Sequence, residues 1–198
     1  LRSVLGTREG FEKPPLPQQD RTKRASRDFE VIEGGPDRDI IDNVPEGSDA
    51  AEALAAMKRV DRDFSVTDFL TGARGAYEMI LTAFERGEMA DIKPFLSDDV
   101  YAALAGVVEQ REAQGLTIDF TFIGISEVRL VEAEMNQINN EAELTVRFTG
   151  EMTSVVHDRG GDVIEGSNSE VKRQRDNWTF ARKMGTNDPN WTLVATGG

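Results

Sequence analysis

The sequence predicts an α+β domain in which helices pack on one face of a curved antiparallel sheet. Two observations carry this prediction. Between residues 48 and 115, apolar residues recur every three or four positions, as on one face of a helix; from Thr117 onward they alternate with polar residues, as in a half-buried strand. Helices that precede the strands, instead of alternating with them, favour a helical layer on an antiparallel sheet.

Composition limits both the domain count and the chemistry. A chain of 198 residues allows one domain with a tail, or two small domains. The absence of cysteine excludes disulfides, thiolate nucleophiles and cysteine-ligated metals, and a single histidine, His157, excludes paired-histidine zinc sites. A net charge of -13 argues against nucleic acid as a partner, because binding to phosphates needs a basic face.

Residues 1–47 are predicted to form a flexible tail and linker. The first 27 residues carry seven basic and three acidic side chains with three prolines, and the residues that follow are acidic and rich in glycine and proline. The basic part fits contact with anionic lipid headgroups and fits a solubilising linker equally well. The opening LRSVLGTR fits a segment after a removed membrane anchor, or a simple truncation.

Residues 48–64 are predicted to form a leading amphipathic helix, while Lys58, Arg59 and Arg62 lie off its apolar stripe. Packing on a neighbouring element is favoured over a helix lying on a membrane surface, because the stripe is thin, with alanine at two of its six positions. The stripe comprises Ala50, Ala53, Leu54, Met57, Val60 and Phe64.

Residues 65–198 are predicted to form the α+β domain proper. Ser65 begins the clearest helix, which Gly87 ends, and Ser97 begins a further helix that Gly115 ends. The inward stripe of the first helix comprises Phe69, Ala73, Ala76, Tyr77, Ile80, Leu81 and Phe84, and that of the second comprises Val100, Tyr101, Leu104, Val107 and Val108. The segments with strand character are residues 117–125, 126–135, 141–148, 170–182 and 190–196.

Both tryptophans of the chain, Trp178 and Trp191, lie in its last 21 residues. We expect them to seal the terminal hairpin by burying large apolar area. No residue pattern indicates an enzyme: no glycine-rich phosphate loop is present, and His157 is interpreted as an ordinary residue at a strand end. We therefore expect no catalytic residues, no metal site and no cofactor.

Three stretches resemble a known family: FLTGARGAYEMILTAFERGEMADIKPFLSDDVYAAL, ELTVRF and DNWTFARKMGTNDPNWTLVAT. They resemble the C-terminal domain of the inner-membrane tethering subunit of the mitochondrial presequence import motor, and are most similar to bacterial relatives. The likeness covers roughly residues 65–196, and the ending, Trp-Thr-Phe-Ala-Arg followed by Asp-Pro-Asn-Trp and Leu-Val-Ala-Thr, is its most specific part.

The resemblance implies an α+β domain similar to the nuclear transport factor two-like cone, with an apolar pocket and no enzymatic activity. It implies an adaptor at the cytoplasmic face of a bacterial inner membrane, with membrane proteins or a chaperone of a translocation or biogenesis system as partners. The domain from residue 64 onward is acidic, with 22 acidic and 12 basic residues. Contact with anionic lipid is therefore expected in the basic tail and at Lys58, Arg59 and Arg62.

Our first hypothesis is a non-enzymatic, membrane-associated adaptor that recruits proteins. Two alternatives stay open: a small-ligand binder or isomerase- or dehydratase-type enzyme on the same cone-like fold, and a peripheral lipid-binding module. Each candidate residue for the pocket or the partner surface is also compatible with a plain core position. These residues are Leu54, Met57, Phe69, Tyr77, Ile80, Phe84 and Tyr101.

Overall fold

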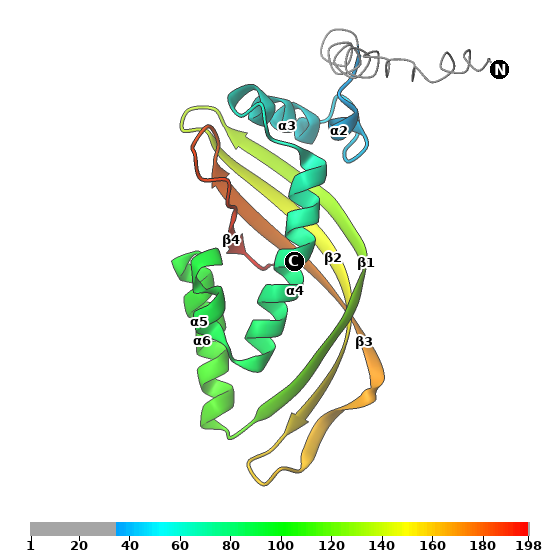
Figure 1. Cartoon of the computed structure of the whole chain (residues 1–198), viewed down its shortest axis with the longest axis vertical. Coiled ribbons are helices and arrows are strands. Elements are labelled where there is room, and N and C mark those ends of the chain that lie inside the picture. Colours follow the sequence, from blue (N-terminus) through cyan, green and yellow to red (C-terminus); the bar gives the residue numbers. More distant parts are fainter. Residues whose placement is uncertain (1–34, 198) are drawn as a thin grey trace, which may run out of the picture. The chain divides into compact units, whose positions relative to one another are not determined.

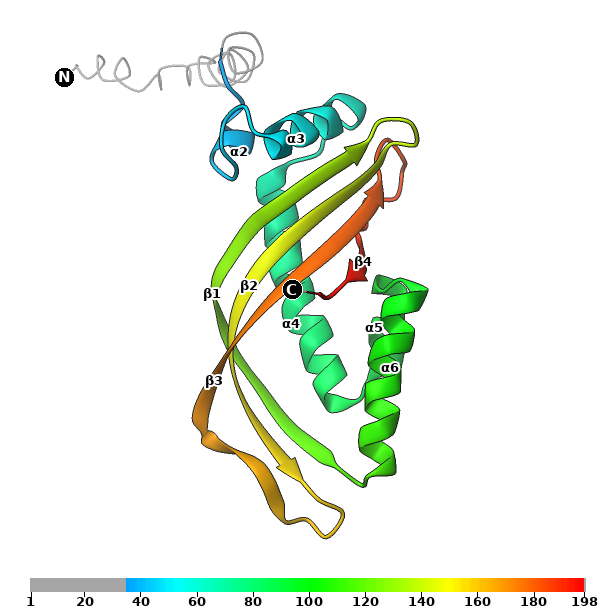
Figure 2. The same ribbon diagram turned by 180° about the vertical axis from the view of Figure 1, so that it is seen from behind.

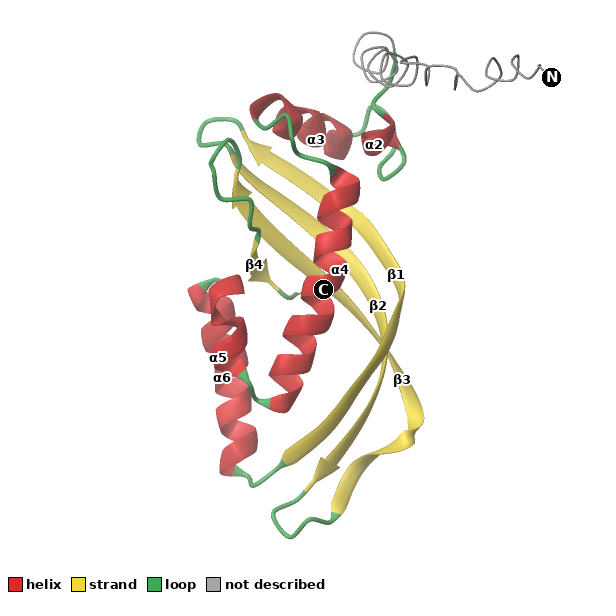
Figure 3. Ribbon diagram, viewed as in Figure 1, coloured by secondary structure: helices red, strands yellow, loops and turns green. Residues whose placement is uncertain are grey.

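The computed structural model describes residues 35–197, in which a run of helices precedes a run of strands (Figures 1 and 3). The helices are α2 Arg38–Ile41, α3 Asp49–Val60, α4 Val66–Arg86, α5 Met89–Ile92, the 3-10 turn η2 Lys93–Phe95, and α6 Asp98–Ala113. The strands are β1 Thr117–Asn136, β2 Glu141–His157, β3 Val163–Lys183 and β4 Thr192–Ala195. The predicted α+β class is confirmed.

The four strands form one antiparallel sheet in the order β1-β2-β3-β4. The sheet is curved, and α4 lies along its hollow face with α5 and α6 beside it (Figures 1 and 2). Three register shifts interrupt the pairing of β1 with β2, between Phe122 and Gly124, Ile125 and Glu127, and Leu130 and Glu132. Such bulges bend a strand, so residues 117–125 and 126–135, predicted as separate segments, form one bent strand.

Serine side chains begin the three long helices, which confirms the predicted starts at Ser65 and Ser97. The Oγ atoms of Ser48, Ser65 and Ser97 each accept a 3.2 Å hydrogen bond from the backbone N–H three residues later. Gly87 ends α4 in the left-handed conformation with φ of 78°, which glycine adopts without steric cost.

Asp39 of α2 provides a second cap for the N-terminus of α4. Its carboxylate accepts hydrogen bonds from the backbone N–H groups of Val66 (2.7 Å) and Thr67 (2.9 Å), and Lys58 Nζ lies 2.8 Å from Oδ2. Burial alone would raise the pKa of Asp39, but Lys58 and these donors outweigh it and lower the pKa to about 2. The carboxylate is therefore ionised wherever the protein is folded under ordinary conditions.

Arg111 of α6 caps the opposite end of α4. Its guanidinium donates to the carbonyl oxygens of Phe84 (2.7 Å) and Glu85 (3.4 Å), and lies 4.9 Å from the centre of the Phe84 ring. Burial raises the pKa of Glu85, and the nearby positive charges of Arg111 and Lys172 partly oppose this rise. Both ends of α4 are thus tied by charged side chains from other helices.

The core lies between α4 and the sheet, and the two tryptophans enter it at different points. The Trp178 ring centre lies 4.7 Å from that of Tyr77 and 5.8 Å from that of Phe148. Trp191 precedes β4 and packs at 4.8 Å against Phe69. The terminal segment therefore closes the fold against α4, as expected for aromatic burial.

Two expectations differ from the structure. Residues 38–47, predicted as flexible linker, contain α2, and Ile40 and Val44 are buried in the main core; the acidic residues and glycines around them masked this pair of apolar side chains. The tail at residues 1–34 lies outside the described residues. Val107, predicted to face inward, is 45% exposed because α6 packs along one side only.

Candidate functional site

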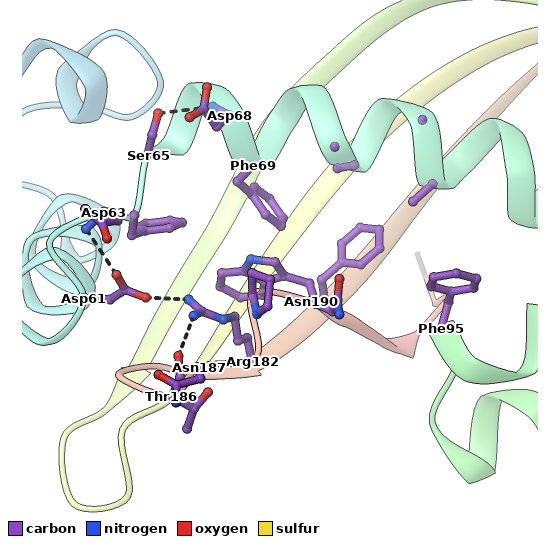
Figure 4. Close-up of a pocket in the computed structure, with 18 of the residues that line it drawn as sticks. Asp61, Asp63, Ser65, Asp68, Phe69, Phe95, Arg182, Thr186, Asn187 and Asn190 are labelled. Carbon is purple, nitrogen blue, oxygen red and sulfur yellow. Dashed lines mark hydrogen bonds and ion pairs between the residues drawn. The ribbon is translucent and has the colours of Figure 1, made fainter.

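An open cavity of about 790 Å³ lies beside α4. Figure 4 shows it bounded by the linker that carries Asp61 and Asp63, by the face of α4 that carries Phe69, by Phe95, and by the loop between β3 and β4. We call it the α4 groove. The described residues that line it are Asp61, Asp63, Phe64, Ser65, Asp68, Phe69, Gly72, Ala73, Gly75, Ala76, Met79, Phe95, Phe180, Arg182, Thr186, Asn187, Pro189, Asn190 and Trp191.

Small residues of α4 line one side of the α4 groove. Gly72, Gly75 and Ala76 come from the middle of α4, and a Cβ atom added at either glycine would meet nothing within 4 Å. Glycine inside a helix costs roughly 0.5–1 kcal/mol relative to alanine. Neither glycine adopts a positive φ, so neither is required by the backbone conformation. Local structure therefore gives no reason for glycine at these two positions.

Apolar side chains form the walls. Met79 is 41% exposed and Phe95 is 38% exposed, although both are large hydrophobic residues. Trp191 is half-buried between Phe64, at 5.9 Å between ring centres, and Phe69, at 4.8 Å. Exposed apolar surface that is concentrated in a concavity is typical of a binding site.

Arg182 holds the loop that forms one wall. Its guanidinium donates to Asp61 Oδ2 at 2.9 Å and to the Thr186 carbonyl at 3.3 Å (Figure 4). It also donates to the Asp188 carbonyl at 2.8 Å. The Arg182 side chain is 8% exposed and that of Asp61 is 17% exposed. The largely buried Arg182 guanidinium thus links β3 to the α3–α4 linker and to the β3–β4 loop.

Carboxylates surround the groove. Asp63 and Asp68 line it and are exposed at the surface. A neighbouring cavity of about 390 Å³ shares Gly75 and Met79 with the α4 groove. It adds three further carboxylates, those of Glu78, Glu88 and Asp91. Among the described residues that line the two cavities, Arg182 is the only cation, and it is already paired with Asp61.

The residues expected to line a pocket lie in different parts of the structure. Leu54, Met57 and Tyr77 are 0% exposed and Ile80 is 1% exposed, so all four lie in the core. Phe69 alone of the expected set lines the α4 groove. Phe84 packs under Arg111, and the Tyr101 ring lies 5.1 Å from Lys93 Nζ.

The three basic residues of the leading helix have different environments. Lys58 forms an ion pair with Asp39, with its side chain 22% exposed. Arg59 is exposed and lines a small cavity with Met135 and Gln137 of the β1–β2 hairpin. Arg62 is exposed in the linker before α4. Arg59 and Arg62 are therefore the two that present their charge to solvent.

His157 lies away from the α4 groove. Its Nε2 is 3.0 Å from Asp119 Oδ2 and its Nδ1 is 3.2 Å from the Gly161 carbonyl oxygen, at the start of β1 and the end of β2. It is absent from the residues that line the groove. No group of three or more histidine, aspartate or glutamate side chains in the described chain is arranged to hold a metal ion.

The sequence pattern missed the residues that shape the site. Gly72 and Gly75 lie inside the clearest predicted helix, beside its apolar stripe, and this glycine pair was the available signal. Arg182 and Asp61 lie 121 positions apart, so only the tertiary structure brings them together. Among residues 35–197, no helix combines the length and apolarity needed to cross a membrane.

Residues 50–198 match the Tim44-like domain family. The human mitochondrial import inner membrane translocase subunit TIM44 is 25% identical over 159 residues, which are 79% of this chain and 35% of that protein. The Arabidopsis thaliana subunit TIM44-1 is 20% identical over 143 residues, 72% of this chain and 30% of that protein. The Drosophila melanogaster large ribosomal subunit protein mL45 is 24% identical over 151 residues, 72% of this chain and 40% of that protein.

The fold is an α+β domain with helices on one face of an antiparallel sheet, and the family match covers most of it. The chain belongs to the Tim44-like domain family. It spans between 30% and 40% of the length of these relatives. Among solved structures, the intermembrane space region of chloroplast protein ARC6 overlaps with a TM-score of 0.36 and 9% identity, over 55% of this chain and 75% of that one.

Proposed function

We propose that this domain is a non-enzymatic adaptor that recruits proteins to a bacterial inner membrane, on its cytoplasmic face. Its partners would be membrane proteins or a chaperone of a protein translocation or membrane-protein biogenesis system. The observation that carries the proposal is the α4 groove, whose walls are exposed apolar side chains. The names of the relatives, an inner-membrane translocase subunit and a ribosomal protein, support a role within a larger assembly.

Membrane attachment in this proposal involves the exposed cations near the N-terminus of the domain. Arg59 and Arg62 are exposed, whereas Lys58 is engaged by Asp39 and contributes to the fold. A basic side chain near an anionic membrane contributes about 1 kcal/mol to binding. Two such residues give weak affinity on their own, so the basic tail or a preceding anchor would add the rest.

A second candidate function is a small-ligand or lipid-binding module. The volume of the α4 groove, about 790 Å³, favours it, because ligand pockets commonly measure roughly 300–1,000 Å³. The acidic residues Asp63 and Asp68 at the rim disfavour anionic lipid headgroups there.

Site-specific photo-crosslinking in cells tests the proposal. A photoreactive residue replaces Met79 or Phe95, which are exposed in the α4 groove, and Val107 serves as the matched control because it is 45% exposed on α6 and lines neither cavity. We expect Met79 and Phe95, but not Val107, to capture a membrane or chaperone protein of a translocation or biogenesis system. Capture of lipid or a metabolite alone would overturn the adaptor and favour the ligand-binding module.

A further inference from the structure

We propose that the α4 groove binds an apolar segment of a membrane-protein partner that is flanked by basic residues, with the partner main chain lying against Gly72 and Gly75. This inference rests on the proposed function and names the partner chemistry of that site. Three features of the described residues carry it: the continuity of two cavities, the α4 glycines that line them, and the charge of their rim.

The first feature is continuity along α4. The α4 groove and the neighbouring cavity share Gly75 and Met79. Together they follow the helix from Asp68 to Ala83, about 22 Å at a rise of about 1.5 Å per residue. That length matches four turns of a helix or six to seven residues of an extended strand, so the site suits a peptide segment better than a compact small molecule.

The second feature is the glycine pair. Gly72 and Gly75 lie one helical turn apart, with Ala76 beside them, and open space stands where their side chains would be. Small residues four positions apart, here Gly72 and Ala76, let another main chain approach a helix closely. Neither backbone conformation nor packing requires glycine at positions 72 and 75. Close approach of a partner main chain would explain why both positions carry glycine.

The third feature is charge. After the pairing of Asp61 with Arg182, five lining carboxylates stand without a cation among the described residues that line the two cavities: Asp63, Asp68, Glu78, Glu88 and Asp91. A groove with apolar walls and an acidic rim is complementary to an apolar segment with Lys or Arg at its ends. Apolar spans of membrane proteins carry such residues on their cytoplasmic flanks, which identifies the partner class.

The first test separates binding from folding. The probe is a fluorescent peptide of eight apolar residues with two lysines at each end, titrated into the full chain. We expect G72A and G75A each to raise the Tm by about 2–4 °C through helix propensity. We expect the same substitutions to weaken peptide binding by about fivefold or more, and G72L to abolish it.

The matched control is G106A, on the exposed surface of α6. A Cβ atom there also meets nothing within 4 Å, and Gly106 lines neither cavity. It should raise the Tm equally and leave peptide affinity unchanged. Equal affinity of G72A, G75A and G106A would overturn the inference, and so would peptide affinity that G72L preserves.

The second test concerns the rim. The double variant D63N/D68N should weaken binding of the lysine-flanked peptide by about three- to tenfold, and higher salt should weaken binding to the wild type. The Tm should fall only slightly, because Asp68 lies in the first turn of α4. A peptide with glutamates in place of the lysines should not bind. Equal binding of both peptides would overturn the inference and indicate a general apolar site. The Met79 cross-linking result is independent of these titrations, so failure of the inference and failure of the proposed function are distinguishable.

Discussion

The phenolic oxygen of Tyr77 donates a 2.6 Å hydrogen bond to Oδ2 of Asp176, and this bond joins the middle of α4 to β3. The Tyr77 ring also stacks on Phe148 at 4.4 Å. Asp176 accepts a second bond from Gln174 Nε2 at 2.8 Å. Burial, with the carboxylate of Asp176, raises the pKa of Tyr77, so the hydroxyl stays a donor throughout the ordinary pH range.

Tyr77→Phe keeps the ring and removes this donor. We expect a loss of about 1–3 kcal/mol in the free energy of unfolding, because Asp176 loses one of two side-chain donors in a partly buried position. Urea denaturation followed by tryptophan fluorescence measures it. Tyr101→Phe is the control, since Tyr101 is only half-buried and lies beneath Lys93. An unchanged denaturation midpoint for Tyr77→Phe would contradict a stabilising role for the hydrogen bond between Tyr77 and Asp176.

Asp39→Asn should destabilise the protein by about 1–2 kcal/mol at pH 7, because it weakens the cap on α4 and removes the ion pair with Lys58. The pKa of Asp39 is about 2 in the folded protein, below its ordinary value of 3.8. A lowered pKa stabilises the folded state fully above the unfolded value, and this contribution disappears as the pH falls toward 2.

The stability difference between wild type and Asp39→Asn should therefore shrink between about pH 4 and pH 2. Thermal melts across this range measure it. Asp42→Asn provides the control, because that side chain is 59% exposed and pairs only with the exposed Arg38. A difference that stays constant from pH 5 to pH 2 would show that the carboxylate charge of Asp39 does not matter.

Arg182 and Asp61 should behave as a coupled pair. Arg182→Met or Asp61→Asn alone leaves a largely buried charge without its partner. The loss in the free energy of unfolding is roughly 3–5 kcal/mol for a fully buried pair, and we expect a smaller loss here because both side chains are partly exposed. The double variant should be more stable than the sum of the single effects predicts, with a coupling of about 1–3 kcal/mol. Chemical denaturation of all four proteins completes the cycle. Strict additivity would mean that the contact carries no energy.

Gly150 and Gly106 should respond to alanine in opposite directions. A Cβ atom at Gly150 would lie 3.1 Å from Cε1 of Tyr77 and 3.2 Å from the methyl of Met152, so Gly150→Ala overpacks the core and should cost about 1–3 kcal/mol. Gly106→Ala meets nothing and should stabilise α6 by up to about 1 kcal/mol. Differential scanning calorimetry distinguishes the two variants. A higher Tm for Gly150→Ala than for the wild type would show that the Tyr77 ring can shift to accommodate the added methyl group.

Local chemistry explains which parts of the fold could be predicted. The caps at Ser48, Ser65 and Ser97 and the end of α4 at Gly87 depend on neighbours within four residues, so the sequence contains them directly. The alternation from Ala142 to Phe148 likewise reports the buried face of β2. By contrast, α2 has four residues, too few to show a helical period, and its order comes from burial of Ile40 and from contacts of Asp39 with α4.

The site was harder to predict because apolar periodicity reports burial, whatever the burial serves. Tyr77 and Ile80 follow the helical stripe perfectly and are core residues for that reason. Met79 and Phe95 shape the groove from positions off the stripes, where the sequence offers only isolated apolar residues. Trp191 was recognised as important for closing the fold; its role as a groove wall depends on the position of the Arg182-held loop.

The three bulges of β1 have a further consequence for the behaviour of the protein at high concentration. β1 is an edge strand, and a long straight edge offers unpaired backbone groups on which strands of other molecules can add. Register shifts at Phe122, Ile125 and Leu130 break the regular spacing of those groups at short intervals. A foreign strand would match β1 for only a few residues before losing register, so the irregularity that curves the sheet also protects a 20-residue edge against aggregation.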